Sequence, residues 1–140
     1  MYRKILLALD ATTAGKALVA HVRELATIHH SKLALIHVAD GWAARNFDAL
    51  KLTESEEMKT DRAYLESTAA DLRSAGLEVE THLALGNPPT EILKCAESQQ
   101  CDLIAMTSHG HRFLADLVLG STIEAVRHRA RIPLLIVRAE

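Results

Sequence analysis

The sequence holds only two cysteines, Cys95 and Cys101, with no CxxC pair and no mixed cysteine and histidine cluster around them. A disulfide framework or a structural zinc site needs more such residues at closer spacing. We therefore expect neither, and we interpret both cysteines as small hydrophobic side chains that are buried or half-buried. No metal site is assigned from the sequence.

Long apolar runs and a strong net charge are also missing. No stretch approaches the roughly 18 to 20 apolar residues of a membrane span, and Met1 leads into a strand-like run without the apolar region of a signal peptide. The formal net charge is −2 and basic residues are scattered, which gives no basic surface for nucleic acid or an anionic membrane. We expect a cytoplasmic protein with no nucleic-acid or membrane partner.

What the sequence does contain is enough apolar residues, 49% of 140, to build the core of one domain over 1–140. Four continuous apolar runs of strand length lie at 5–9, 33–38, 103–106 and 133–137. Such runs are typical of strands that are covered on both faces. A fifth stretch, 77–85, alternates apolar and polar residues and predicts a strand with one exposed side or an edge position.

Between these runs, apolar residues recur at helical spacing over 14–28 and over 58–72. The boundary signals are Thr53 with Glu56 and Ser121 with Glu124 as capping boxes, Gly76 as a C-cap, and Asn87 with Pro88 as an N-cap and first turn. Strands that alternate with helices predict an α/β fold with an open, mostly parallel sheet wound on both sides. Ligands of such sheets bind at the carboxyl ends of the strands. The segment 40–52, with Trp42 and Phe47, is predicted as a loop over that end.

Two glycines are expected at the ligand end of the sheet. Gly120, followed by Ser121 and Thr122, is predicted at the start of the last helix, where unpaired N–H groups and the helix dipole can hold phosphate oxygens. Gly110 follows the fourth strand and lets a second stretch of main chain approach the same anion. Nearby donors are His109, His111 and Arg112. The alternative is that Ser121 only caps the helix and both glycines only form turns.

Signatures of the better-known enzyme classes are missing. There is no GxGxxG after the first strand, no GxxxxGK[ST], and no GxSxG around Ser108 or Ser121. Asp10 follows the first strand and could cap the first helix. His37 lies within an apolar strand, and we interpret it as a hydrogen-bonded core histidine rather than a ligand.

Five stretches of the chain carry a resemblance to a known family: "ILLALD", "LALIHVAD", "ALGNPPTEIL", "CDLIAMTSHG" and "LGSTIEAVRHRARIPLLIVR". Together they resemble the universal stress protein family, over essentially the whole chain. The resemblance implies a Rossmann-like, open five-stranded parallel sheet of the adenine nucleotide alpha hydrolase-like type, with helices on both faces. It also implies a homodimer, in agreement with the apolar strand 133–138 that ends the chain and leaves an edge to pair.

The family's nucleotide-binding members carry a pattern of glycine, two residues, glycine, nine residues, glycine, then serine or threonine. Gly110, the nine residues 111–119, Gly120 and Ser121 match this pattern, whereas Thr107 stands in place of the first glycine. If that glycine is needed for a positive φ, Thr107 is strained by about 1 to 3 kcal/mol. If it is needed only for closeness to the ligand, Thr107 costs some room and adds a hydroxyl.

The ligand that the resemblance implies is ATP or another adenine nucleotide, with or without Mg²⁺. Asp10 matches the residue that faces the ribose, Val38 the main chain that holds the adenine, and Gly110, Gly120, Ser121 and Thr122 the phosphate site. The other positions carried over are Ala8 and Met106 as walls and Thr107, Ser108 and His109 in the loop.

The sequence contains no convincing catalytic residue, so we expect a regulatory stress-response protein that holds its nucleotide. Two alternatives stay open. One is a dimeric adaptor that binds no nucleotide and acts through protein contacts. The other is a slow ATP hydrolase.

Overall fold

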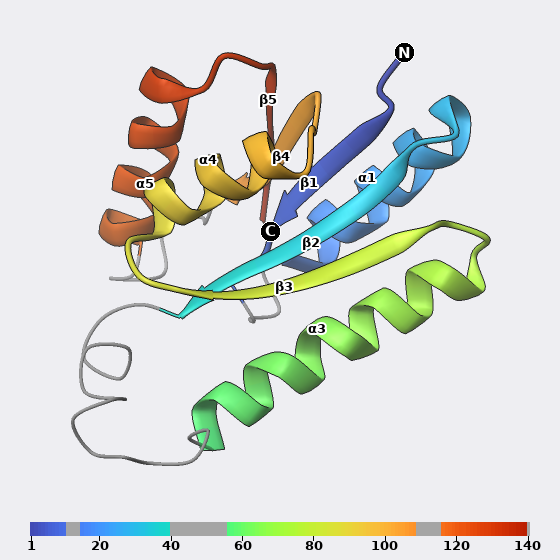
Figure 1. Ribbon diagram of the computed structural model, residues 1–140, viewed down its shortest axis with the longest axis horizontal. Coiled ribbons are helices and arrows are strands. Elements are labelled where there is room, and N and C mark those ends of the chain that lie inside the picture. The colour runs from blue at the N-terminus through green and yellow to red at the C-terminus, as the bar shows by residue number, and fades with distance from the viewer. Residues whose placement is uncertain (11–14, 40–55, 109–115, 140) are drawn as a thin grey trace.

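The computed structural model describes residues 1–10, 15–39, 56–108 and 116–139, which form a parallel sheet with helices on both faces (Figure 1). The strands are β1 (Lys4–Ala8), β2 (Lys32–Ala39), β3 (Val79–Leu85), β4 (Leu103–Ser108) and β5 (Leu134–Arg138). The helices described are α1 (Gly15–His29), α3 (Glu56–Ser74), α4 (Pro88–Ser98) and α5 (Asp116–Arg129). The predicted α/β class and the predicted alternation of strands and helices are confirmed.

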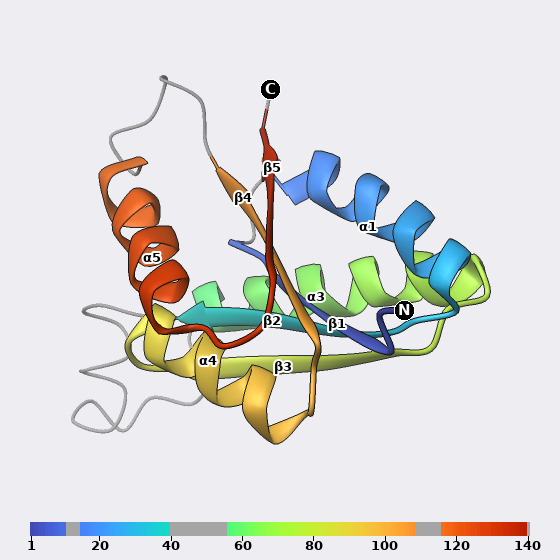
Figure 2. The same ribbon diagram turned by 90° about the horizontal axis from the view of Figure 1, so that it is seen from above.

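The strands lie in the order β3-β2-β1-β4-β5, and every neighbouring pair is parallel. The chain therefore builds outward from β1 to β3 and then crosses to the other side of β1 to form β4 and β5. The strand order reverses between β1 and β4, and the rule for open parallel sheets places ligands beside their carboxyl ends. The predicted edge position of 77–85 is confirmed, and β5 forms the opposite edge, as Figure 2 shows.

The sheet separates two apolar clusters, one on each face. Ile5, Leu7 and Leu35 point to the face that α1 and α3 cover. Leu6 and Ile36 point to the face that α4 and α5 cover. Figure 1 shows the two helix pairs on opposite sides of the sheet. Because side chains alternate along a strand, a strand covered on both faces needs apolar residues at every position, which explains the uninterrupted runs.

Two of the predicted helix boundaries are confirmed. Asn87 caps α4, and its side-chain oxygen accepts a hydrogen bond from the Thr90 N–H. Gly76 follows α3 with a φ of +90°, the Gly76 N–H donates to the Arg73 carbonyl, and the Leu77 N–H donates to the Leu72 carbonyl. These two bonds define a Schellman motif, which glycine favours because it has no Cβ to clash at positive φ. Thr53 lies outside the described residues.

We predict that Gly76→Ala lowers the free energy of unfolding by about 1 to 2 kcal/mol, the cost of a left-handed alanine. Open space surrounds the position, so the cost is conformational and not steric with respect to neighbours. Gly76→Asn should lose less than half as much, because asparagine tolerates this conformation. Urea denaturation measures both, and equal losses for the two variants would contradict the assignment.

Candidate functional site

The two predicted wall residues, Ala8 and Met106, come together on one face of the sheet with Val38, whose main chain is predicted to hold the adenine. Ala8 of β1 and Val38 of β2 are half-buried, Met106 of β4 is buried, and all three pack in the apolar cluster beneath α4 and α5. They come from the three central strands, β2, β1 and β4, at or near the carboxyl ends. The structure therefore brings these apolar residues into one cluster near the point where the strand order reverses.

The end of β1 is tied to the end of β2. The Leu9 N–H donates to the Ile36 carbonyl at 2.8 Å, and the Leu9 carbonyl accepts a hydrogen bond at 2.8 Å from the Nδ1 atom of His37. The next residue is Asp10, which is half-buried. The expected position of Asp10 at the carboxyl end of β1 is confirmed.

Asp10 lies close enough to α3 for its charge to act on the Tyr64 hydroxyl. Burial raises the pKa of the Tyr64 hydroxyl on α3, and the negative charge of Asp10 raises it further. A Cβ atom on Gly15 would lie 3.0 Å from that hydroxyl, so the missing side chain gives Tyr64 its place. Residues 11–14 lie outside the described part of the chain, so the suggestion that Asp10 caps the first helix stays a prediction.

Thr107, the residue in place of a glycine, has an ordinary strand conformation. It lies in β4 and is not among the described residues with positive φ, so the strained alternative is wrong. The residue is 4% exposed, and its hydroxyl donates to the Val137 carbonyl of β5 at 3.0 Å. Because side chains alternate along a strand, Thr107 points away from the face of Met106. The extra hydroxyl therefore bonds to the neighbouring strand.

The predicted start of the last helix needs correction. The helix α5 begins at Asp116, so Gly120 and Ser121 lie inside it, and Ser121 is not its cap. Leucines favour helix, whereas an internal glycine costs only about 1 kcal/mol, so a helix can run through Gly120. Thr122 is buried in the same helix.

Several predicted residues lie outside the described part of the chain. Among the site residues these are His109 and Gly110, together with their neighbours His111 and Arg112. The segment with Trp42 and Phe47 lies outside it as well. Ser108, the last residue of β4, is half-buried, and its carbonyl accepts a hydrogen bond from the Ala139 N–H.

His37 is confirmed as a hydrogen-bonded core histidine, and its partner is a residue that the sequence pattern did not single out. The Nε2 atom of His37 lies 3.1 Å from the Oδ2 atom of Asp61 on α3. Asp61 is 9% exposed and belongs to the buried stripe of α3, with Met58, Leu65 and Ala69. Position 61 belongs to the helical spacing of that stripe, where an apolar residue is expected. A carboxylate at such a position was the sequence feature that could have predicted a buried polar partner.

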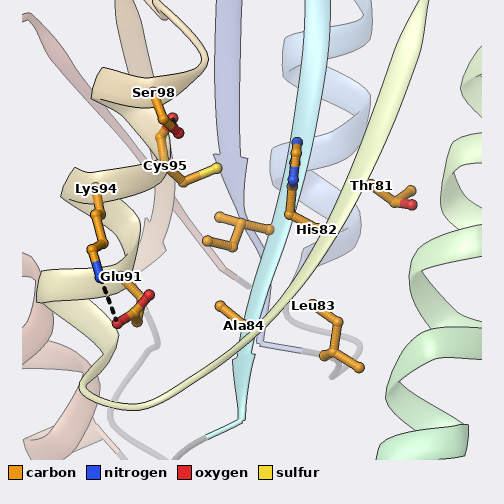
Figure 3. A pocket seen from close by; sticks show the side chains of 9 residues that line it. Thr81, His82, Leu83, Ala84, Glu91, Lys94, Cys95 and Ser98 are labelled. Carbon is orange, nitrogen blue, oxygen red and sulfur yellow. Dashed lines mark hydrogen bonds and ion pairs between the residues drawn. The ribbon is translucent and has the colours of Figure 1, made fainter.

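A separate pocket of about 420 Å³ lies between the edge strand β3 and α4 (Figure 3). His82 and Ala84 of β3 face it from one side, and Glu91, Lys94 and Cys95 of α4 from the other. Lys94 and Glu91 form an ion pair at 4.0 Å. The pocket is thus lined by one ion pair, whose two charges cancel, and by the half-buried Cys95.

Both cysteines are free, as predicted, with Cys95 half-buried and Cys101 buried. Burial raises the pKa of both thiols, to about 11 for Cys101. Within the described ranges, no three histidine, cysteine or acidic residues come together as a metal site. Among those residues, no helix combines the length and the apolar character that a membrane crossing needs.

Comparisons with known proteins place the chain among relatives of similar length. A model of the universal stress protein family matches residues 1–138. Universal stress protein MJ0577 of Methanocaldococcus jannaschii is 28% identical, and the match covers 99% of this chain and 96% of that protein. A universal stress protein of Thermus aquaticus is 31% identical, with 99% of this chain and 100% of that protein covered.

Solved structures agree with the fold. A structure of protein MJ0577 has a TM-score of 0.83 at 28% identity and covers all of this chain and 98% of its own. A universal stress protein in complex with cAMP has a TM-score of 0.71 at 19% identity, covering 97% and 96% of the two chains. One from Archaeoglobus fulgidus in complex with dAMP has the same TM-score and identity, covering 96% and 97%.

We predict that Thr107→Val lowers the free energy of unfolding by about 1 kcal/mol, because the Val137 carbonyl loses its hydroxyl donor while the buried volume is kept. The matched control is Thr27→Val, whose hydroxyl bonds the Arg23 carbonyl on an exposed helix surface. Thermal denaturation compares the two. Equal losses in both variants would show that the buried hydrogen bond of Thr107 contributes no more to stability than the exposed one of Thr27.

Proposed function

The chain belongs to the universal stress protein family, and from this premise we propose that it is a regulatory protein that binds an adenine nucleotide. The proposed site lies at the carboxyl ends of β2, β1 and β4, where the strand order reverses. The cytoplasm remains its predicted location, from the sequence.

The observation that carries the proposal is the apolar cluster of Ala8, Val38 and Met106 at the carboxyl ends of three strands, with Asp10 two residues after the end of β1. Flat apolar walls suit the faces of an adenine ring, and a carboxylate at the strand end suits the ribose hydroxyls as hydrogen-bond acceptor. Thr107 leaves this face clear, because its side chain lies on the other side of β4 and bonds to Val137. The residues present therefore fit an adenine nucleoside.

Two relatives support the class of ligand. Their structures are described as complexes with cAMP and with dAMP, and both molecules contain adenine, a pentose and one phosphate. Both are 19% identical to this chain, so the ligand is carried over only as part of the proposal. In sequence, Gly110, Gly120 and Ser121 match the pattern of the family's nucleotide-binding members, and this resemblance makes ATP the first nucleotide to test, although Gly120 lies inside α5. Any Mg²⁺ would be held chiefly by the phosphates.

We propose binding without efficient hydrolysis. Glycine loops and helix N-termini hold phosphate through main-chain N–H groups, and these groups supply no general base. Slow ATP hydrolysis is the second candidate, and a nucleotide-free adaptor is the third. Both are outcomes of the experiment below.

We predict that the purified protein binds ATP, ADP or AMP in isothermal titration calorimetry, and that Asp10→Asn weakens binding about tenfold or more. The reason is that a hydrogen bond to a charged acceptor contributes about 1.5 to 3 kcal/mol. Asp71→Asn on the exposed surface of α3 is the matched control and should bind as the unmodified protein does.

Three results would change the proposal. Absence of binding at millimolar concentrations of all three nucleotides would favour the adaptor. Release of phosphate from ATP above background, abolished by Gly120→Val, would favour the hydrolase. Equal affinities of the Asp10→Asn and Asp71→Asn variants would remove Asp10 from the site.

We also propose that the protein is a homodimer formed through β5. This strand has a paired neighbour on one side only, and Ile136 on it is 39% exposed. An apolar edge strand is a surface on which a second copy can pair or pack, with the same patch used by both copies.

We predict that Ile136→Glu converts a dimer into a monomer, because it places a charge in an apolar contact. Analytical ultracentrifugation over a range of concentrations measures the change. The control is Ile28→Glu, which alters an apolar residue that is 73% exposed in the last turn of α1. A protein that is monomeric before any substitution would sink this proposal.

A further inference from the structure

The side chain of His37 joins three elements at the carboxyl end of the sheet. His37 lies on β2, and its ring contacts the Leu9 carbonyl after β1 at 2.8 Å and the Asp61 carboxylate of α3 at 3.1 Å. The His37 and Asp61 side chains are 12% and 13% exposed, so both are largely withdrawn from water. Hydrogen bonds between such groups are stronger than between solvated ones, and an unmade one costs more.

The two contacts together need one more proton than a neutral histidine beside an ionised aspartate has. A carbonyl oxygen can only accept, so the Nδ1 atom must carry a hydrogen. A neutral imidazole has a single N–H, which leaves the Nε2 lone pair facing a carboxylate. Both contacts hold only when a second proton lies between the Nε2 atom of His37 and the Oδ2 atom of Asp61. Loss of that proton breaks one of the two contacts.

The contact with Leu9 acts directly on Asp10. The Leu9 carbonyl and the Asp10 N–H belong to one planar peptide group, so whatever orients the carbonyl orients the start of Asp10. On its other side, the Leu9 N–H is bonded to the Ile36 carbonyl at 2.8 Å. The hydrogen bond to the His37 ring is thus the second bond, after that to Ile36, that fixes the main chain leading into Asp10.

Other titratable groups surround this pair. On α3, Tyr64 lies one turn after Asp61 and interacts with the charge of Asp10, while Lys59 and Arg62 are exposed. The register partner of His37 on β3 is Leu83, which carries no charge. Of these groups, only the Asp61 carboxylate is within ion-pair distance of the ring.

We propose that His37, held by Asp61, is a positioning residue of the nucleotide site: it fixes the peptide between Leu9 and Asp10, and the proton that it shares makes nucleotide affinity fall as pH rises. The inference rests on the proposed function and extends it to regulation. The sign follows from the contacts, since both need the protonated pair. The affinity that they support is present at low pH and is lost on raising the pH.

The deciding variant is Asp61→Asn. The amide NH2 of the substituted side chain can donate to the Nε2 atom of a neutral His37, whose Nδ1–H still donates to Leu9. This variant keeps the geometry without the second proton. We therefore expect it to bind ATP at about pH 6 as tightly as the unmodified protein and to bind better at about pH 9.

Calorimetric affinities for ATP without Mg²⁺, measured from about pH 6 to about pH 9, a range that spans ordinary histidine titration, give the comparison. Titration of ATP itself affects both proteins equally. In the unmodified protein the affinity should fall about five- to tenfold more than in Asp61→Asn, the equivalent of one hydrogen bond. A double variant, His37→Phe with Asp61→Leu, removes the hydrogen bond to the Leu9 carbonyl without leaving a buried charge. It should bind ATP at least about tenfold more weakly at every pH. His82→Phe on β3 is its control.

Parallel pH profiles of the unmodified protein and Asp61→Asn, or full affinity in the double variant, would overturn the inference and leave the proposed function standing. If no nucleotide binds at all, the proposed function fails and a ligand-free measurement decides the inference. The NMR signal of the Asp10 amide should then move with the His37 ring signals between about pH 6 and about pH 9 and stay fixed in Asp61→Asn. An Asp10 signal that ignores the ring would overturn it.

Discussion

The end of β1 is fixed to β2 by two hydrogen bonds of Leu9, one through its N–H to Ile36 and one through its carbonyl to His37. A strand end normally leaves its polar main-chain groups to water or to a loop, and here both are bonded within the protein. Because β1 is the central strand, its last residues set the direction in which the chain leaves the sheet. The position of Asp10, and with it the proposed ribose contact, depends on this junction.

The helix α3 contributes no apolar residue to the proposed site, but through this junction it affects the position of Asp10. Asp61 and Tyr64 lie one helical turn apart and point from α3 toward the end of β1, where they meet His37 and the surroundings of Asp10. A buried carboxylate costs free energy unless it is paired, so Asp61 and His37 stabilise the fold only together. Because this polar pair lies beneath the proposed binding site, we explain it by what it holds and not by stability alone.

Much of the fold can be predicted from the sequence, because an unbroken apolar run of strand length is typical of a strand covered by helices on both faces. The runs at 5–9, 33–38 and 103–106 became the three central strands, and the alternating run 77–85 became an edge. The site is harder to predict, since it depends on contacts between distant segments. Asp61 is 24 residues from His37, and no local spacing joins them. The start of α5 was missed because Ser121 and Glu124 form a capping signal that the preceding Asp116–Leu119 turn overrides.

The replacement of a motif glycine by Thr107 can be judged on the same geometric grounds. A strand offers each residue only one face, and position 107 faces α1, opposite to the cluster of Ala8, Val38 and Met106. A side chain there cannot crowd a ligand on the Met106 face, and a β-branched residue suits strand backbone better than glycine does. Its hydroxyl ties β4 to β5 through Val137. The departure from the family pattern therefore adds a bond between β4 and β5 and leaves the Met106 face clear for the proposed ligand.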